Sequence, residues 1–174
     1  MAESARCTTR PVRTVPDVEP VARPTARVLL LDDADRLLLF RSLDDRGAAF
    51  WYPVGGRVEA GETVQDAAVR ELHEETGLSN VQLGPEVWRR RHVVGWRGVE
   101  YDIRERWFIA RVDRFDIDTS GFTHAERTEV LEHRWWSPAE LANAKERLVP
   151  ADLAARLTEL LTKGPPAEPR EVGI

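Results

Sequence analysis

The sequence contains very little cysteine: Cys7 is the single thiol among 174 residues. One thiol cannot form an internal disulfide, and it cannot supply a zinc site built from several cysteines. Long hydrophobic runs are also missing, because no window approaches the roughly 18 apolar residues that a membrane span requires. The first 25 residues lack the apolar core of a secretory signal. We therefore expect a cytoplasmic protein with no membrane partner.

The chain also lacks an excess of positive charge, since its formal net charge is −5. A protein that binds a nucleic-acid duplex or an anionic membrane usually carries a basic surface. We therefore expect no stable nucleic-acid complex. A partner with nucleotide chemistry is expected to be a small molecule.

The size and composition, with 42% hydrophobic and 32% charged residues, are typical of one compact domain. Residues 1–25 contain several prolines and no apolar periodicity, which predicts a flexible N-terminal arm. Residues 26–162 form the expected domain. Residues 163–174 are rich in proline and charge and are predicted to be a disordered tail.

Within the domain, two short apolar runs around "DDAD" predict a β-hairpin from residue 26 to about residue 42. A loop rich in glycine then precedes a helix that begins near Thr63. Asp66 three residues later suggests a capping box, and Gly77 suits the left-handed position after the last turn. Further strands are predicted at 86–94, 101–113 and 130–136, and further helices after Ser137 and Pro150.

The helix after Thr63 places acid where a core face should be. At about 100° per residue, Val64 and Leu72 lie on the side that must face the core. Glu71 and Glu75 project into the middle of that side, and Glu74 lies on its flank. Carboxylates packed together and partly desolvated destabilise a fold unless a cation compensates. Hard oxygen ligands favour Mg²⁺ or Mn²⁺.

A simpler explanation is a solvated helix face, with an ion pair between Arg70 and Glu74. The helical angles disfavour this explanation, because a solvated face would lie opposite Leu72 rather than beside it. The glycine-rich loop before the helix disfavours it further.

The segment from Gly56 to Leu78, "GRVEAGETVQDAAVRELHEETGL", resembles the Nudix box at every fixed position. The hairpin before it, the "WYPVGG" that leads into it and the later "RWWSPAEL" also resemble this family, so the likeness extends from about Ala26 to Leu161. The resemblance implies an α/β fold, the Nudix-like α/β/α sandwich with a mixed β-sheet.

The resemblance also implies an enzyme, a pyrophosphohydrolase that cleaves a nucleoside diphosphate linked to another moiety with the help of Mg²⁺, or of Mn²⁺. A nucleoside triphosphate or a nucleotide sugar would be a substrate of this kind. The implied metal ligands are Glu71, Glu74, Glu75 and the backbone carbonyl of Gly55. Outside them, Glu62 and Gly56 would support the site, and Arg70 would orient a ligand carboxylate.

The general base stays open between Glu74 or Glu75 and an acid further along the chain. The later candidates are Glu126, Glu129 and Glu132, and the spacing back from "RWWS" favours Glu129 as the family's additional acid. A solvated turn is the alternative for all three. His124 could contact phosphate, although a lone histidine in a loop is more often simply exposed.

For substrate binding we select Arg41, Arg57 and Trp51, which could contact phosphates and stack on a base. Strand tryptophans are more often core residues, which applies to Trp51, Trp88, Trp96 and Trp107. In the "WRRRH" run, neighbouring residues of a strand must point to opposite faces, so its three arginines cannot all serve one site. The substrate subclass stays open.

A second function class is a Nudix-like module that senses a nucleotide without cleaving it. The complete set of acids favours the enzyme, since a sensor does not need them. The family often forms homodimers, but the sequence shows no dimer interface.

Overall fold

The structure is a computed structural model that describes residues 19–96 and 98–173; Cys7 and the Trp96 side chain lie outside this description. The elements in chain order are β1 (Val21–Leu31), β2 (Leu37–Leu43), β3 (Ala49–Tyr52), α1 (Val64–Thr76), β4 (Leu83–Trp96), β5 (Val99–Arg111), α2 (His124–Glu129), β6 (Glu132–Trp136), α3 (Pro138–Ala142), β7 (Arg147–Leu148), α4 (Leu153–Lys163) and β8 (Arg170–Glu171).

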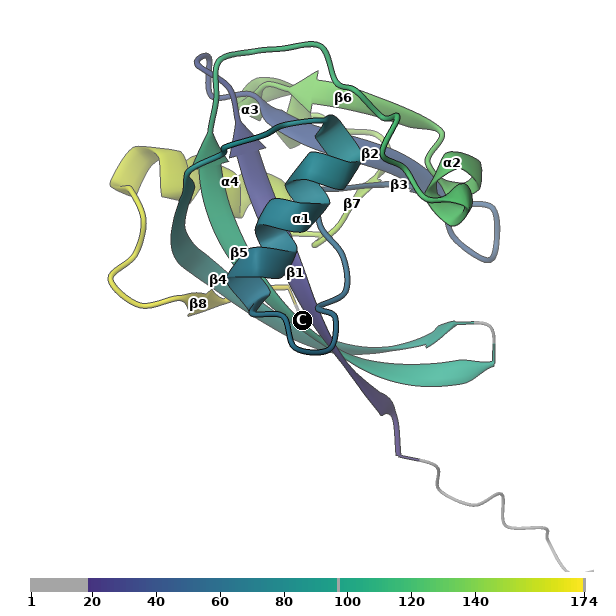
Figure 1. The fold of residues 1–174 in the computed structure, drawn as a ribbon. Coiled ribbons are helices and arrows are strands. Elements are labelled where there is room, and N and C mark those ends of the chain that lie inside the picture. The colour runs from purple at the N-terminus through teal and green to yellow at the C-terminus, as the bar shows by residue number, and fades with distance from the viewer. Residues whose placement is uncertain (1–18, 97, 174) are drawn as a thin grey trace, which may run out of the picture.

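One curled, mixed sheet joins the strands in the order β7-β3-β2-β1-β5-β4-β8, with β6 paired to β2. Strand β1 runs parallel to β5, whereas β4 and β5 are antiparallel. Helix α1 lies on one face of the sheet, and α3 and α4 lie on the other (Figure 1). This arrangement confirms the expected sandwich of helices around a mixed sheet.

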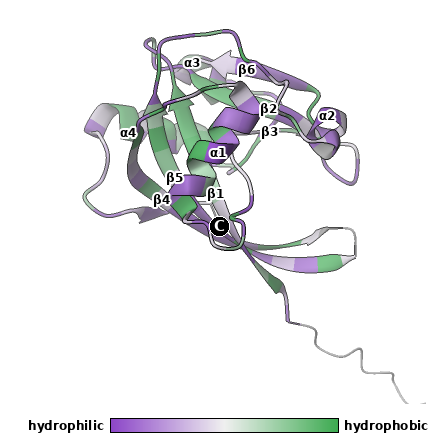
Figure 2. Ribbon diagram, in the orientation of Figure 1, coloured by the Kyte–Doolittle hydropathy of each residue, from purple (hydrophilic) through white to green (hydrophobic). Residues whose placement is uncertain are grey.

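Two apolar cores form on the two faces of the sheet. Beneath α1, the buried side chains include Val28, Phe40, Leu72 and Phe108. The core beneath α3 and α4 contains Leu29, Leu39, Trp51, Trp88, Trp107, Trp136, Leu141 and Leu157. Successive residues of a strand point to opposite faces, so β1 contributes to both cores. In Figure 2 the apolar colour is concentrated on the strands behind α1.

The predicted hairpin is confirmed only at its turn. β1 and β2 pair at Leu31 and Leu37 and then separate, and β1 instead follows β5 along its whole length. The loop after β3 fills the gap: the Ala26 and Val28 amides donate to the carbonyls of Gly56 and Val54, both at 2.9 Å. This pairing fixes the glycine-rich loop against the centre of the sheet.

Helix α1 begins and ends as predicted. Thr63 and Asp66 form a reciprocal capping box, and Gly77 ends the helix with a φ of 75°. Such a φ is in the left-handed region that glycine adopts without strain. The local sequence therefore sets both ends of the helix that carries the acids.

The structure corrects the expected ends of the domain. Strand β1 begins at Val21, within the predicted arm, because β5 supplies a parallel partner for its backbone. In the predicted disordered tail, β8 pairs with β4, the Val172 amide donates to the Arg89 carbonyl at 2.9 Å, and the Val172 side chain is buried. Helix α4 begins at Leu153 rather than directly after Pro150. No helix in the described part of the chain has the length and apolar character to span a membrane.

Candidate active site

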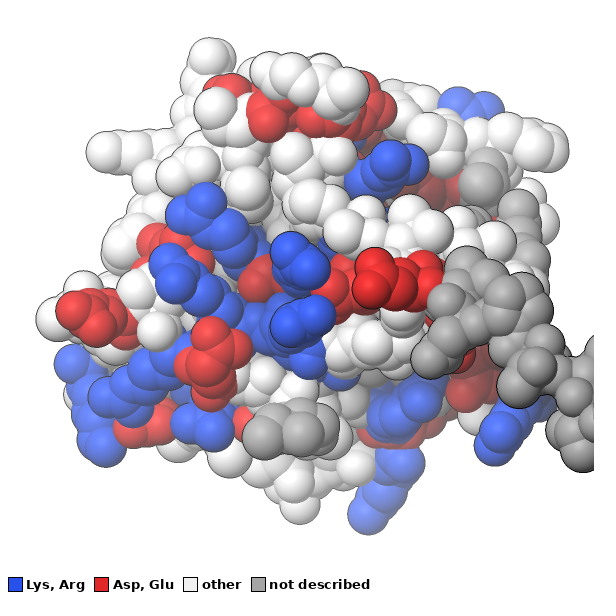
Figure 3. Space-filling view, turned by 90° about the horizontal axis from the view of Figure 1, so that it is seen from below, with Lys and Arg blue, Asp and Glu red and all other residues white. Residues whose placement is uncertain are grey.

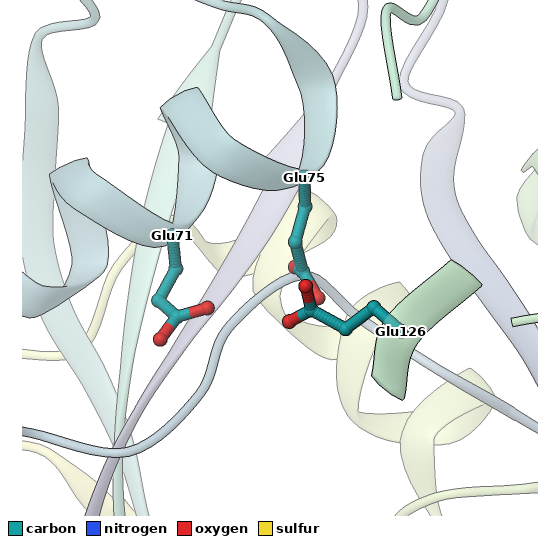
Figure 4. A group of neighbouring side chains, drawn as sticks. All are labelled: Glu71, Glu75 and Glu126. Carbon is teal, nitrogen blue, oxygen red and sulfur yellow. The ribbon is translucent and has the colours of Figure 1, made fainter. Parts of the chain in front are cut away.

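Three carboxylates meet beneath α1. Glu71 and Glu75 come from this helix, and Glu126 comes from α2. Each residue offers one oxygen, and these three oxygens all lie within 4.8 Å of one another. Figure 4 shows the three side chains pointing into a common space from two sides. The site therefore joins segments that are far apart in the sequence.

Burial makes this cluster electrostatically costly. The exposed fractions of Glu71 and Glu75 are only 6% and 3%. Burial raises the pKa of Glu71, and it holds the pKa of Glu75 well above its usual range. The neighbouring Glu74 and Glu126 add to the effect on Glu71, and Glu71 adds to the effect on Glu75. A cation bound among these oxygens would favour the ionised carboxylates and lower both pKa values.

The glycine loop gives the carboxylates their places. The Gly55 amide donates to the Glu75 carboxylate at 2.8 Å. A Cβ on Gly56 would lie 2.4 Å from the Glu71 carboxylate, so a larger residue there would require this carboxylate to move. Gly55 itself has a φ of 132°, and a Cβ there would lie 2.1 Å from the Ala26 carbonyl oxygen. Gly55 is therefore required by its backbone conformation and backbone contact, whereas Gly56 leaves the Glu71 carboxylate in its present place.

The Gly55 carbonyl, predicted to be a metal ligand, accepts a hydrogen bond from Arg27 Nη1 at 2.7 Å. Arg27 also pairs with the buried Glu105 at 3.4 Å. Arg27 is not among the site residues predicted from the sequence. The sequence signal is a charged residue directly before the apolar run of β1, which does not specify a contact 28 residues away.

Arg70 connects the acids of the box. It donates from Nε to Glu62 and from Nη1 to both Glu71 and Glu74, each at 2.9 Å. Its Nη2 donates to the Arg57 carbonyl, also at 2.9 Å. Glu74 therefore lies on the flank beside Arg70, outside the group of three oxygens.

Of the later acids, the structure brings Glu126 to the cluster and not Glu129. Gly121 packs so closely on α1 that a Cβ would lie 2.5 Å from the Glu74 carbonyl oxygen, which brings the start of α2 against that helix. Glu126 stands in this first turn. Glu129 ends α2 with an exposed side chain, and its carbonyl accepts from Ser42 Oγ at 2.9 Å. His124 and Glu132 are exposed as well.

The three selected substrate residues are not assembled around the acids. Arg41 and Trp51 both donate to Glu146, with Nε and Nε1 distances of 2.7 and 2.8 Å. Trp51 is buried in the core beneath α3 and α4, the face opposite α1. Arg57 follows the glycine loop directly and is exposed, so it alone remains beside the site.

The donor set fits a hard divalent cation. Carboxylate oxygens are the ligands that Mg²⁺ and Mn²⁺ prefer. Two of these carboxylates are buried with raised pKa values, and Gly56 keeps space in front of one of them. The residues present can therefore hold a metal ion between α1 and α2.

Residues 21–157 match the family model of the NUDIX domain. The chain belongs to this family, and it is a hydrolase that acts on pyrophosphate bonds. Nudix hydrolases generally use a divalent metal, and many of them act on small nucleotides.

The relatives include an RNA pyrophosphohydrolase from Novosphingobium aromaticivorans, 31% identical over 130 residues that cover 68% of this chain and 80% of that protein. A second RNA pyrophosphohydrolase, from Caulobacter vibrioides, is 32% identical over 147 residues that cover 75% of this chain and 79% of that protein. Among solved structures, the MutT protein from Methanosarcina mazei Go1 aligns with a TM-score of 0.63 and 20% identity, covering 82% of this chain and 97% of that one. The last likeness shows the fold alone.

Proposed function

We propose that this protein hydrolyses a pyrophosphate bond at the 5′-triphosphate end of RNA, with Mg²⁺ or Mn²⁺ as cofactor. The observation that carries the proposal is the group of Glu71, Glu75 and Glu126, which brings three carboxylate oxygens within 4.8 Å of one another. The choice of RNA rests on the two relatives named RNA pyrophosphohydrolase, both more than 30% identical to this chain.

In this proposal, Glu71, Glu75 and Glu126 hold the metal. When bound, the cation neutralises charge on the phosphate oxygens and lowers the pKa of a coordinated water. The Gly55 amide and Arg70 fix the carboxylates of Glu75 and Glu71 in position. Arg27 fixes the Gly55 peptide from its other side. The loop therefore does not need to move to form the site.

For the general base we propose Glu74. Its side chain is 37% exposed, so it can accept a proton beside the cluster and release it to solvent. Glu75 is almost fully buried and is already engaged by the Gly55 amide. The pH dependence of kcat in Glu74→Gln, compared with the parent, tests this assignment. If kcat of Glu74→Gln no longer falls toward acidic pH, the result supports Glu74 as the base. If the pH profile of the variant is unchanged, the base is another residue.

The first experiment is product analysis by mass spectrometry, with and without Mg²⁺. The panel contains a 5′-triphosphorylated RNA oligonucleotide, nucleoside triphosphates, 8-oxo-dGTP, nucleotide sugars and dinucleoside polyphosphates. Metal-dependent conversion of the RNA end to a monophosphate, at a higher kcat/KM than any mononucleotide, is the expected result. A preference for a mononucleotide overturns the choice of RNA. Binding without cleavage of any compound would instead support the nucleotide sensor.

A further inference from the structure

A second charged surface lies on the same side of the sheet as α1, where β4 and β5 continue beyond the start of the helix. The register pairs Arg89 with Arg106 and Arg91 with Arg104. Directly paired residues of antiparallel strands share a face, and so do residues two apart. These four side chains, the arginine quartet, therefore form a compact group on one face.

Two nearly buried carboxylates, Asp102 and Glu86, form ion pairs with the four arginines of the quartet. Asp102 accepts from Arg91 Nε at 2.8 Å and from Arg104 Nη2 at 2.7 Å. Glu86 likewise pairs with Arg89 at 2.7 Å and with Arg106. The Asp102 and Glu86 side chains are only 7% and 10% exposed, whereas the four arginine side chains are between 37% and 68% exposed.

The quartet therefore presents a local excess of positive charge. Four guanidinium groups share two buried carboxylates, and the exposed Glu171 lies near Arg89, so the group carries a formal charge of +4 − 3 = +1 in a protein whose net charge is −5. The two arginines hold the pKa of Asp102 at about 2, so this carboxylate stays ionised at neutral pH. Each guanidinium has five N–H donors, more than the carboxylates beneath it engage.

A purely structural ion-pair ladder does not explain this composition well. Like charges directly opposite each other on antiparallel strands destabilise the pair. One arginine for each carboxylate would stabilise the two acids without that repulsion. The two additional arginines instead leave ordered donors that face solvent. An anion with several oxygens, such as a phosphate, is the ligand that arginine groups bind in a bidentate manner.

The quartet lies close to the proposed active site. Its arginines line a hollow of about 500 Å³ together with Arg90, Glu105 and Glu171. Pro24 of β1 and Val64, the first residue of α1, also line this hollow. Val64 is 71 − 64 = 7 residues before Glu71, which corresponds to about 10 Å along the helix axis. Figure 3 shows Lys and Arg gathered around scattered acids on the underside of the molecule.

We propose that the arginine quartet binds backbone phosphates of the RNA strand that continues from the triphosphate end held at Glu71, Glu75 and Glu126. This inference rests on the proposed function, and it assigns the substrate a second, sequence-independent contact. Phosphate contacts of this kind position a strand without reading its bases. The surface also modifies the expectation from net charge, because a local group of arginines can bind a strand that the whole protein would repel.

Binding is tested separately from catalysis with a fluorescent 5′-hydroxyl octaribonucleotide, followed by anisotropy over a range of salt concentrations. The test variant combines Arg91→Gln, Arg104→Gln and Asp102→Asn, which removes the pair without leaving a buried charge. The matched control is Arg111→Gln, on the same strand, because Arg111 is 54% exposed, close to the 57% of Arg104. Both variants change the net charge by −1.

The test variant is expected to weaken binding roughly tenfold and to lower the slope of log Kd against log salt by about 1.4, or 0.7 for each lost phosphate contact. The control should retain the parent slope and affinity. Equal effects in both variants would overturn the proposal, because they would report net charge alone. Retained binding in the test variant would overturn it as well.

Kinetics then distinguishes this inference from the proposed function. KM for a 5′-triphosphorylated octamer should rise roughly tenfold in the test variant, while KM for GTP and kcat for both substrates stay unchanged. If the parent cleaves GTP but no RNA, the proposed function fails whatever the binding experiment shows. If it cleaves RNA and the variant raises KM equally for GTP and octamer, the quartet inference fails alone.

Discussion

The carboxylate cluster and the arginine quartet both place like charges side by side, but they differ in how the charge is compensated. In the cluster, Glu71 and Glu75 are buried and their pKa values are raised. In the quartet, each carboxylate serves two arginines, and the pKa of Asp102 falls to about 2. The carboxylates of the quartet are already compensated by the arginines paired with them, whereas Glu71 and Glu75 would be compensated by a bound cation.

The largest expected effect concerns Glu75. Glu75→Gln should lower kcat by roughly 10²- to 10³-fold, since a metal ligand is lost from the site where charge is stabilised. The metal-free variant should nevertheless melt no lower than the metal-free parent, because a buried charge is removed. Calorimetry in EDTA and steady-state kinetics with Mg²⁺ measure the two quantities.

Asp102→Asn is the matched comparison for stability. Its carboxylate has a folded-state pKa below the usual value, so its ion pairs stabilise the fold above that value and lose their effect as pH falls toward 2. This variant should melt lower than the parent at pH 7. We therefore expect the melting temperature to fall in Asp102→Asn and not to fall in metal-free Glu75→Gln. A fall in both variants would contradict the comparison.

Arg70 should give the next largest effect. Arg70→Ala removes the donor shared by Glu62, Glu71 and Glu74, so we expect kcat/KM to fall by about 10- to 100-fold. Arg70→Lys should recover only part of this loss, because an ammonium cannot reproduce the fork of contacts. Full activity in Arg70→Ala would show that the carboxylates hold their positions alone.

Metal affinity should increase with pH. Glu71 and Glu75 have raised folded-state pKa values, so the metal-free fold binds more protons than the unfolded chain between their usual and raised values. Its stability therefore falls as pH rises through this window, and metal binding must release protons. The increase in melting temperature caused by Mn²⁺ should grow from pH 5 to pH 8. A pH-independent increase would place the metal elsewhere.

The smallest effect is expected at Arg41. Arg41 is bound to Glu146 and projects from the sheet face opposite α1. Arg41→Gln should therefore change KM for the triphosphate substrate less than about twofold, within the usual range for a surface substitution. A tenfold increase in KM would restore the substrate-binding role that the sequence suggested.

The sequence predicted the parts of the molecule that depend on local periodicity. Thr63, Asp66 and Gly77 specify the ends of α1, and the 3.6-residue repeat places Glu71 and Glu75 on its core face. These interactions extend over one or two turns, so the sequence alone contains them. The Nudix resemblance depends on the same segment and supplied the fold class.

The rest depended on contacts between distant segments. The spacing back from "RWWS" favoured Glu129, whereas the structure brings Glu126 to the cluster, where Gly121 packs on α1. The face on which Trp51 lies follows from the register of β2 with β3. The contact of Arg27 with the Gly55 carbonyl depends on the separation of β1 from β2, which leaves room for the glycine-rich loop beside β1. Residues 170–171 form strand β8 because β4 supplies a neighbouring strand with which they pair.

The sequence by itself therefore determined the helix, its buried glutamates and the chemistry that they suit, because side-chain direction within a helix follows from the backbone repeat. Only the tertiary structure decided which third acid completes the group and how four arginines gather over two carboxylates. Those arrangements depend on strand register and close packing, which are set by pairing between residues far apart in the chain.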